Sequence, residues 1–383
     1  MKKILSKFGV ATAVLYLIGC SLTACNAQST PKRSLLALSK TDHTLAIIDP
    51  ATLKILARVP VGSDPHEVIA STDGKTAYVT IYGGGTLHEL DIIDLIAQKP
   101  LVNLDTRPLF GPHGLDFANG KAWFTAEGSK SIGRYDPATG KLDWSMGTGQ
   151  DRTHMIYVTP DAKRIYTTNV ASGTVSILTD TLVQGGPPGP PPGQGRPAAQ
   201  GPPGGQGSPN PQAAPGGQGS PNPQGPPPGG GLREQWTQTL VPVSRGSEGF
   251  DVSPDGKQLW TAASEDGAIS VIDLDAKKLS VKIDAHVQGA NRLKFTPDGK
   301  LVFISSLGTG DLVIYDAVSQ KEVKRLKTGH GAAGILMDPV ANRAFVACSG
   351  DNNIVVVDLK TLEITGRFDV GGVPDGLAWA VQQ

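Results

Sequence analysis

The chain repeats a unit of four short β-rich segments, and this repetition constrains its fold more than any other feature. A Pro-Asp-Gly-like turn precedes a β-rich run such as TAYVTIY, QLWTAAS or LVFISSL, and a second run then ends in aspartate. A period of 40 to 45 residues with four strands per unit is typical of a β-propeller, because a single blade can bury its two faces only between neighbouring blades. Apart from one longer interval, the aspartates recur every 42 to 45 residues; they are Asp49, Asp94, Asp136, Asp273, Asp316 and Asp358.

The two ends of the chain complement each other. Complete sets of four strands begin near residues 66, 113, 154, 248, 291 and 333. The chain before residue 62 supplies only three strands, whereas GLAWAVQ at 376–382 supplies a lone innermost strand. We therefore predict an all-β, seven-bladed β-propeller over residues 35–383, closed by pairing of the N- and C-terminal strands in a three-plus-one blade.

A proline- and glycine-rich insertion interrupts one repeat at residues 184–231. It holds 16 of the 30 prolines, and glycine does not recur at every third position, which argues against a collagen triple helix. The segment has no apolar side chain larger than proline, so it cannot build a core. We predict a disordered loop between the two outer strands of its blade, on the face opposite to the entry of the innermost strands.

The N-terminus has the form of a targeting segment. A basic start, MKKILSK, precedes the apolar run FGVATAVLYLIG, which is short for a spanning helix. LIGC and LTAC both resemble the lipobox of bacterial lipoproteins. This resemblance predicts a signal peptide at 1–19, lipidation of Cys20 (with Cys25 as the alternative) and a tether at 20–34. The protein would then be exported to the periplasm or cell surface and held at the membrane only by lipid; an ordinary cleaved signal peptide is the other interpretation.

Charge and cysteine content exclude several classes of protein. Lysine plus arginine and aspartate plus glutamate both total 35, which gives no electrostatic case for nucleic acid binding. The three cysteines form no CxxC or CxxCH motif, so the sequence favours neither a thiolate zinc site nor haem. The oligomeric state stays open.

Polar residues recur at one place in each repeat, at the entry to the innermost strand. Because all innermost strands of a propeller line the channel and run the same way, these residues should form one ring at one channel mouth. In chain order the ring is His66, His113, His154, Glu248, Asn291, Ala333 and Asp375. Further residues predicted near this mouth are Glu67, Arg152, Arg292, His330, Tyr82, Glu127, Asn169 and Glu265.

The ring allows three interpretations. His66, His113 and His154 could bind a divalent metal such as zinc with help from the carboxylates. Without metal, the ligand-binding set His66, His113, His154, Glu248, Asn291 and Asp375 could form a pocket for a small molecule, glycan or protein. The third interpretation is a solvated channel lining, since the channel of a seven-bladed propeller is wide enough to hold its ring neighbours apart.

Two resemblances bear on these alternatives. The runs VSPDGKQLWTAASEDGAISVIDLDAKKL (252–279) and FTPDGKLVFIS (295–305) resemble the YVTN-repeat family of seven-bladed propellers, which implies a fold but no particular activity. The stretch PHGLDFANGKAWFTAEGSKSIGRYDPATG (112–140) looks like a streptogramin lyase blade. That second resemblance implies that His113 and Glu127 are catalytic counterparts in a metal-dependent elimination. The leading hypothesis is a binding scaffold, and the alternative is a metal-assisted lyase or hydrolase, such as a lactonase.

Overall fold

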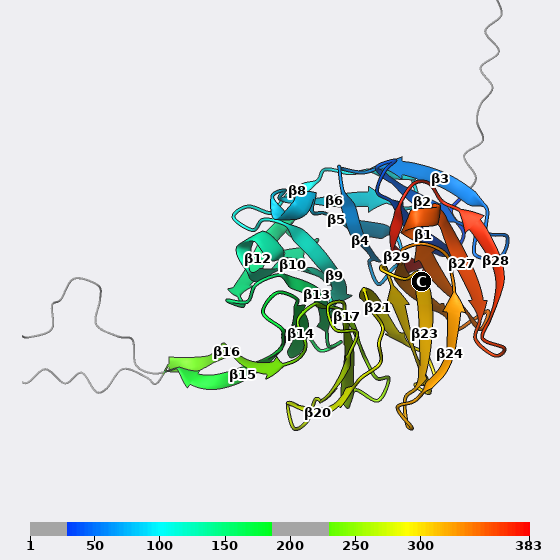
Figure 1. Cartoon of the computed structure of the whole chain (residues 1–383). Coiled ribbons are helices and arrows are strands. Elements are labelled where there is room, and N and C mark those ends of the chain that lie inside the picture. The colour runs from blue at the N-terminus through cyan, green and yellow to red at the C-terminus, as the bar shows by residue number, and fades with distance from the viewer. Residues whose placement is uncertain (1–28, 186–229) are drawn as a thin grey trace, which may run out of the picture.

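Seven antiparallel sheets form a closed ring around a central channel (Figure 1). The computed structural model describes residues 29–185 and 230–383. In six sheets the first strand along the chain is innermost, in the seventh it is the C-terminal strand, and each innermost strand packs against those of the two neighbouring blades. The predicted seven-bladed β-propeller is confirmed.

The ring closes through blade 1, which joins the two ends of the chain. The C-terminal strand β29 (Pro374–Val381) is innermost and pairs antiparallel with β1 (Arg33–Ser39), followed by β2 (Thr44–Ile48) and β3 (Ile55–Pro60). Leu35 lies opposite Trp379 in this pairing. The predicted three-plus-one closure is therefore confirmed.

The remaining six blades follow in chain order. Blade 2 has β4 (Pro65–Ala70), β5 (Thr76–Ile81), β6 (Glu89–Asp94), β7 (Lys99–Pro100) and β8 (Leu104–Asp105). Blade 3 has β9 (Pro112–Ala118), β10 (Lys121–Ala126), β11 (Ser131–Asp136) and β12 (Lys141–Gly147). Blade 4 has β13 (Thr153–Val158), β14 (Arg164–Asn169), β15 (Thr174–Gly185) and β16 (Gly230–Pro242). Blade 5 has β17 (Ser247–Val252), β18 (Gln258–Ala263), β19 (Ile269–Asp273) and β20 (Lys278–Ile283). Blade 6 has β21 (Ala290–Phe295), β22 (Leu301–Ser306), β23 (Asp311–Asp316) and β24 (Glu322–Lys327). Blade 7 has β25 (Ala332–Asp338), β26 (Arg343–Cys348), β27 (Asn353–Asp358) and β28 (Glu363–Asp369). Three short 3-10 turns lie at Gly83–Gly85, Glu127–Ser129 and Ser349–Asp351.

Local turn chemistry explains why each repeat folds into hairpins. The aspartate at the end of a third strand accepts hydrogen bonds from the backbone N–H groups two or three residues ahead, as Asp358 does from Lys360 and Thr361. The glycines of the Pro-Asp-Gly turns have positive φ, for example +72° at Gly256. Repetition of these two turns sets the spacing of the strands in the sequence.

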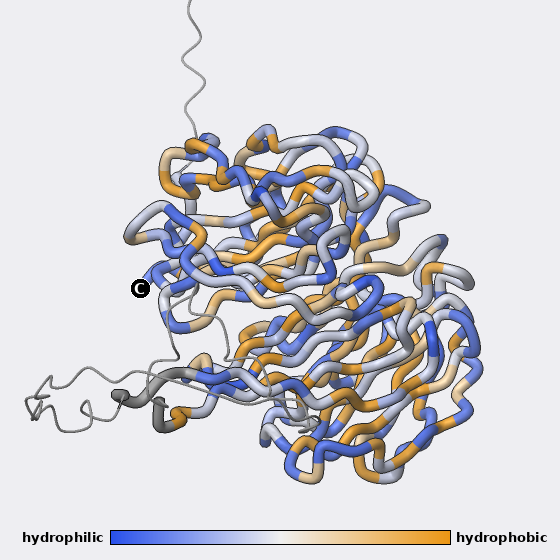
Figure 2. Tube along the Cα trace, turned by 90° about the vertical axis from the view of Figure 1, so that its left-hand side faces the viewer, coloured by the Kyte–Doolittle hydropathy of each residue, from blue (hydrophilic) through white to orange (hydrophobic). Residues whose placement is uncertain are grey.

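Hydrophobic residues are concentrated along the strands of the ring, and hydrophilic residues prevail in the peripheral turns (Figure 2). The second strand of blade 6, β22, is buried along nearly its whole length, and the outer strand β24 alternates between exposed and half-buried positions. No helix within the described ranges is long and apolar enough to cross a membrane.

Two outer strands differ from the regular plan. In blade 2 the fourth strand is divided into β7 and β8, both of which pair with β6. In blade 4, β15 and β16 form a hairpin of 12 and 13 residues that projects from the ring (Figure 1). The ends of the predicted insertion 184–231 lie in these strands, and residues 186–229 lie outside the described part of the chain. Residues 1–28, with the predicted signal peptide, Cys20 and Cys25, also lie outside it.

Candidate functional site

A β-bulge places the ring residues at the channel mouth. In all seven blades the pairing between the first two strands shifts register near the entry of the innermost strand. In blade 4, for example, Thr153 pairs with Asn169 and Ile156 with Thr167, so His154 and Met155 lie in the irregular step. A bulge re-aims the side chains that it contains, and here these are the predicted ring residue and the residue after it.

The position after the ring residue lies against the next blade. In four blades it is glycine, and a Cβ at Gly114 would lie 2.3 Å from the carbonyl oxygen of His154. A hydroxyl from the second strand also ties neighbouring blades together. Thr80 donates to the carbonyl oxygen of His113 at 2.7 Å, and Thr125 donates to that of His154 at 2.5 Å. The backbone at the ring is thus fixed from both sides.

The three histidines lie in one row of touching, mutually tilted rings, called the histidine stack below. The ring centroids of His66 and His113 are 4.5 Å apart, and those of His113 and His154 are 3.9 Å apart. Tyr82 contacts His113 edge-on at 5.0 Å. The channel is therefore narrow enough at this mouth for neighbouring imidazoles to touch, although a wide channel that holds them apart was one of the interpretations of the sequence.

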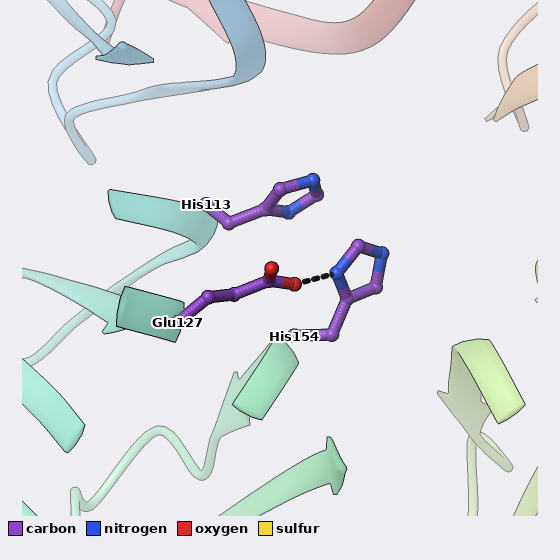
Figure 3. A group of neighbouring side chains, drawn as sticks. All are labelled: His113, Glu127 and His154. Atoms are coloured by element: carbon purple, nitrogen blue, oxygen red, sulfur yellow. Dashed lines mark hydrogen bonds and ion pairs between the residues drawn. The ribbon is translucent and has the colours of Figure 1, made fainter. Parts of the chain in front are cut away.

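Glu127 joins the stack from the loop that follows β10. Its Oε1 pairs with Nδ1 of His154, and its Oε2 accepts a 2.5 Å hydrogen bond from the Tyr82 hydroxyl. Nε of Arg152 lies 3.6 Å from the same Oε2. His113, Glu127 and His154 are all buried, and each offers a ligand atom within 4.8 Å of the other two (Figure 3).

Two ring nitrogens in this group are buried and lack a hydrogen-bond partner among the residues that the structure describes. They are Nδ1 of His113 and Nε2 of His154. Buried polar atoms are seldom left unpaired, so these two nitrogens are candidates for a bound ion. Two imidazoles and a carboxylate are a common donor set for Zn²⁺ and other divalent metals.

The electrostatics of the group suit a metal ligand set. Burial lowers the pKa of His113 well below its ordinary value, and the neighbouring charges of His154 and His66 lower it further. Burial alone would raise the pKa of Glu127, but hydrogen bonds from His154 and Tyr82 lower it. Near neutral pH, His113 is thus neutral and Glu127 ionised, which are the forms that bind a cation.

In blades 5 and 6 the polar ring continues through Glu248 and Asn291. The Asn291 amide donates to Oε2 of Glu248 at 2.7 Å, and a guanidinium nitrogen of Arg152 lies 3.7 Å from Oε1 of Glu248. Arg152 therefore connects Glu127 to Glu248, and the polar contacts extend over four consecutive blades, 3 to 6.

An ion pair crosses the channel and divides it. Arg292 of blade 6 pairs with Glu67 of blade 2, although three blade boundaries separate them on the shorter side of the ring. Arg292 is only 7% exposed, and Asp375 lies 4.0 Å away from it. Burial by itself would lower the pKa of Arg292, but Glu67 and Asp375 raise it, so this guanidinium stays charged. The pair forms the floor of the histidine mouth.

A cavity lies on each side of this floor. The upper cavity has a volume of about 300 Å³, and the lower cavity, of about 340 Å³, is more apolar and includes Asp116, Tyr157 and Trp379. The polar side chains that line the upper cavity are Lys40, His66, Tyr82, His113, Arg152, His154, Glu248, Asn291, Arg292, Ser349 and Asp375.

All seven predicted ring residues thus line the upper cavity, including Ala333. The cluster of potential metal ligands, however, is His113, Glu127 and His154, whereas His66 contacts Lys40 and Asp64. Three other predicted residues lie apart from the cavity. Asn169 is buried within blade 4, while Glu265 and His330 are exposed.

Sequence reasoning missed Lys40 and the ion pair across the channel. Lys40 follows the second strand of blade 1, the same place that Tyr82 and Glu127 occupy in the next two blades. The same position in the closing blade, after the strand that pairs with the innermost one, is the signal in the sequence that points to Lys40. The pairing of Glu67 with Arg292 carries no such signal, because it depends on the channel radius.

Fold and site together define a seven-bladed β-propeller with a buried His–Glu–His group at one channel mouth. No family model and no curated protein matches the chain. Among solved structures, a functionally unknown protein from Desulfotomaculum acetoxidans shares 12% identity over 91% of this chain and 99% of its own, with a TM-score of 0.64.

Two further structures, each described as a candidate 6-phosphogluconolactonase, come from species of Bacteroides. The protein of Bacteroides uniformis has 16% identity and a TM-score of 0.64 over 91% of this chain and 99% of its own. That of Bacteroides fragilis has 15% identity and a TM-score of 0.64 over 92% and 99%. Similarity at this level of identity shows the fold alone.

Proposed function

We propose that the chain is a binding propeller that holds one divalent cation through His113, Glu127 and His154 and offers the upper cavity to a ligand. The observation that carries this proposal is the pair of buried ring nitrogens, His113 Nδ1 and His154 Nε2. They lie near an ionised Glu127 and have no hydrogen-bond partner within residues 29–185 and 230–383. A bound ion would supply Lewis acidity to an oxygen of a small molecule, glycan or protein group in the cavity.

Metal analysis tests this proposal. The full chain is expressed with its own N-terminal segment, purified without a histidine tag and analysed by inductively coupled plasma mass spectrometry before and after incubation with Zn²⁺. We expect about one ion per chain, and at least a ten-fold lower content in His113→Ala/His154→Ala and in Glu127→Gln, because each change removes donors that hold the ion.

His286→Ala serves as the matched control, because the His286 side chain is 80% exposed and outside the cavity. It should keep the wild-type metal content. Equal metal in the wild type and in the double variant, or none in either after incubation with Zn²⁺, would exclude the proposed site and leave the histidines as channel lining or as direct ligand contacts.

A second candidate function, a metal-assisted lyase or hydrolase, is favoured by the neutral His113 beside Glu127. Both residues match the blade that resembles streptogramin lyase, and the Bacteroides structures are described as candidate 6-phosphogluconolactonases. In such an elimination or hydrolysis, His113 would transfer a proton, and Glu127 and Tyr82 would keep the neighbouring side chains in position. The test is turnover of a panel of lactones and cyclic depsipeptides; activity that falls at least 100-fold in His113→Ala supports an enzyme, and no turnover by metal-loaded protein argues against it.

We further propose export and lipid anchoring through Cys20. Its support is the apolar N-terminal run and the LIGC motif. Cys20→Ser should move the protein from the membrane fraction to the soluble exported fraction. If Cys25→Ser does so instead, the alternative cysteine carries the lipid, and if neither change does, the lipid anchor is excluded.

A further inference from the structure

The ammonium group of Lys40 is surrounded by three acceptor side chains beside the histidine stack. Lys40 follows β1 in blade 1, and its backbone N–H donates to the carbonyl oxygen of Val373 at 3.2 Å. Its Nζ lies 2.6 Å from Nε2 of His66, 3.2 Å from Oδ1 of Asp64 and 3.6 Å from Oδ2 of Asp375. The side chain is only 20% exposed.

These three contacts form a donor set for a cation. A lysine ammonium group has three N–H donors and no acceptor, so the groups around it serve as acceptors and counter-charges. Nζ also lies 3.3 Å from Nδ1 of His66, and Nε2 of His66 is itself 3.0 Å from Oδ1 of Asp64. One imidazole nitrogen and two carboxylate oxygens from blades 1 and 2 then surround one positive charge. The same types of donor bind divalent metals in proteins.

The second position adjoins the first. The His66 ring contacts the His113 ring at a centroid distance of 4.5 Å, with the two planes tilted by 51°, and both residues line the upper cavity. Two groups of donors thus lie next to each other at the mouth. Asp64, Asp375 and His66 surround the ammonium group of Lys40, and His113, Glu127 and His154 surround the proposed ion. Arg152 and Arg292, the other cationic side chains in the cavity lining, are both paired with carboxylates.

We propose that Lys40 is a built-in second cation, so that the channel mouth is a two-cation centre with one tethered ammonium and one exchangeable metal ion. This inference extends the proposed function. It assigns a separate cation position to His66, Asp64 and Asp375, which Lys40 closes to metal. A substitution that removes the ammonium group of Lys40 should make this position available to a metal ion. Without the ammonium group or an ion, the three donors would surround an empty space and stay uncompensated.

Metal stoichiometry of Lys40 variants tests the proposal. Wild type, Lys40→Met and Lys40→Ala are titrated with Zn²⁺ by isothermal calorimetry and examined by native mass spectrometry, with a thermal melt to show that each is folded. We expect Lys40→Met and Lys40→Ala to bind one more ion per chain than wild type. The additional ion should be lost in Lys40→Met/Asp64→Asn and in Lys40→Met/His66→Ala.

The additional ion is counted relative to wild type, so the two proposals fail separately. If wild type binds no metal but Lys40→Met binds one ion that Asp64→Asn removes, the His113 site is wrong and the Lys40 inference holds. If folded Lys40→Met and Lys40→Ala bind no more metal than wild type, or if the extra ion survives both second substitutions, the inference is overturned. Lys40→Arg, which keeps the charge, should show no gain.

Discussion

At the residue scale, the channel mouth depends on a two-residue bulge that recurs in every blade. The first bulge residue could be predicted from the sequence, because it keeps a constant offset from the Pro-Asp-Gly turn. The second could not, because glycine fills it in four blades and Glu67, Met155 and Arg292 fill it in the others. The bulge brings Glu67 and Arg292 together across the channel, and a strict alternation of side chains would not have predicted this contact.

Tyr82 is a positioning residue in this arrangement. Its hydroxyl donates to Oε2 of Glu127, and among the described residues no other side-chain hydroxyl forms a hydrogen bond to that carboxylate. Tyr82→Phe removes only the hydroxyl, so we expect the Zn²⁺ affinity to fall roughly ten-fold while the stoichiometry stays at one ion. Calorimetry measures both. An unchanged affinity would show that Tyr82 does not hold Glu127 in place for the metal.

Asp116, in the lower cavity, predicts a pH dependence of stability. Burial raises the pKa of Asp116 to about 6, well above the ordinary value of an aspartate. Hydrogen bonds from the backbone of Val158 and Phe117 and the charge of Lys294 act against burial, and the charge of Asp251 acts with it. The folded state therefore holds this proton where the unfolded chain has lost it, and the free energy of unfolding falls as pH rises from 4 to 6.

We expect this one group to lower the free energy of unfolding by about 2 kcal/mol over this pH range. This figure already allows for the partial exposure of Asp116 to water in the channel. Denaturant unfolding at pH 4, 5, 6 and 7 measures it. Asp116→Asn, which cannot ionise, should lose less stability than wild type over this range. Parallel curves for the two proteins would contradict the raised pKa.

At the element scale, the strand that closes the ring has a clear sequence signal and a testable energetic role. Trp379 on β29 donates its indole N–H to the carbonyl oxygen of Met337 at 2.8 Å, and the guanidinium of Arg33 lies 3.5 Å from its ring centre. The side chain thus joins the last strand to blade 7 and to the first strand of the described chain. The three-plus-one closure could be predicted from the missing strands alone, but these contacts of Trp379 could not.

Trp379→Ala should lower the free energy of unfolding by about 3 kcal/mol, because it removes a large half-buried ring and opens the contact with Arg33. Trp379→Phe keeps an aromatic ring and loses the indole hydrogen bond, so about 1 kcal/mol is expected. Urea unfolding followed by circular dichroism measures both changes. Equal small losses in the two variants would mean that the closing blade tolerates loss of this ring.

Two features could not be predicted from the sequence, and each belongs to the outer strands of a blade. The fourth strand of blade 2 is divided into β7 and β8, and the hairpin of β15 and β16 continues into the predicted insertion. An outer strand has a partner on only one side and little burial, so few constraints act on its sequence. The inner three strands of each blade, which pack against neighbouring blades, follow the repeat closely and could be predicted.

At the scale of the whole molecule, the ring of polar residues and the end of the β15–β16 hairpin lie on different faces. The ring residues enter at the start of the innermost strands, whereas antiparallel pairing places the β15–β16 connection at the other end of blade 4. The predicted insertion on the face opposite the ring is consistent with this topology. The candidate site and the hairpin end are therefore independent parts of the molecule.

This independence predicts that a short turn can replace residues 186–229. Gln184 lies opposite Leu232 in the hairpin, so an Asn-Gly turn can join the two strands where they already pair. A shorter connection also costs less closure entropy, by about 2 kcal/mol. The shortened chain should melt at or slightly above the wild-type temperature and bind the same number of Zn²⁺ ions. A melting temperature that falls by about 10 °C, or a lost ion, would instead show that the segment contributes to the propeller or to its site.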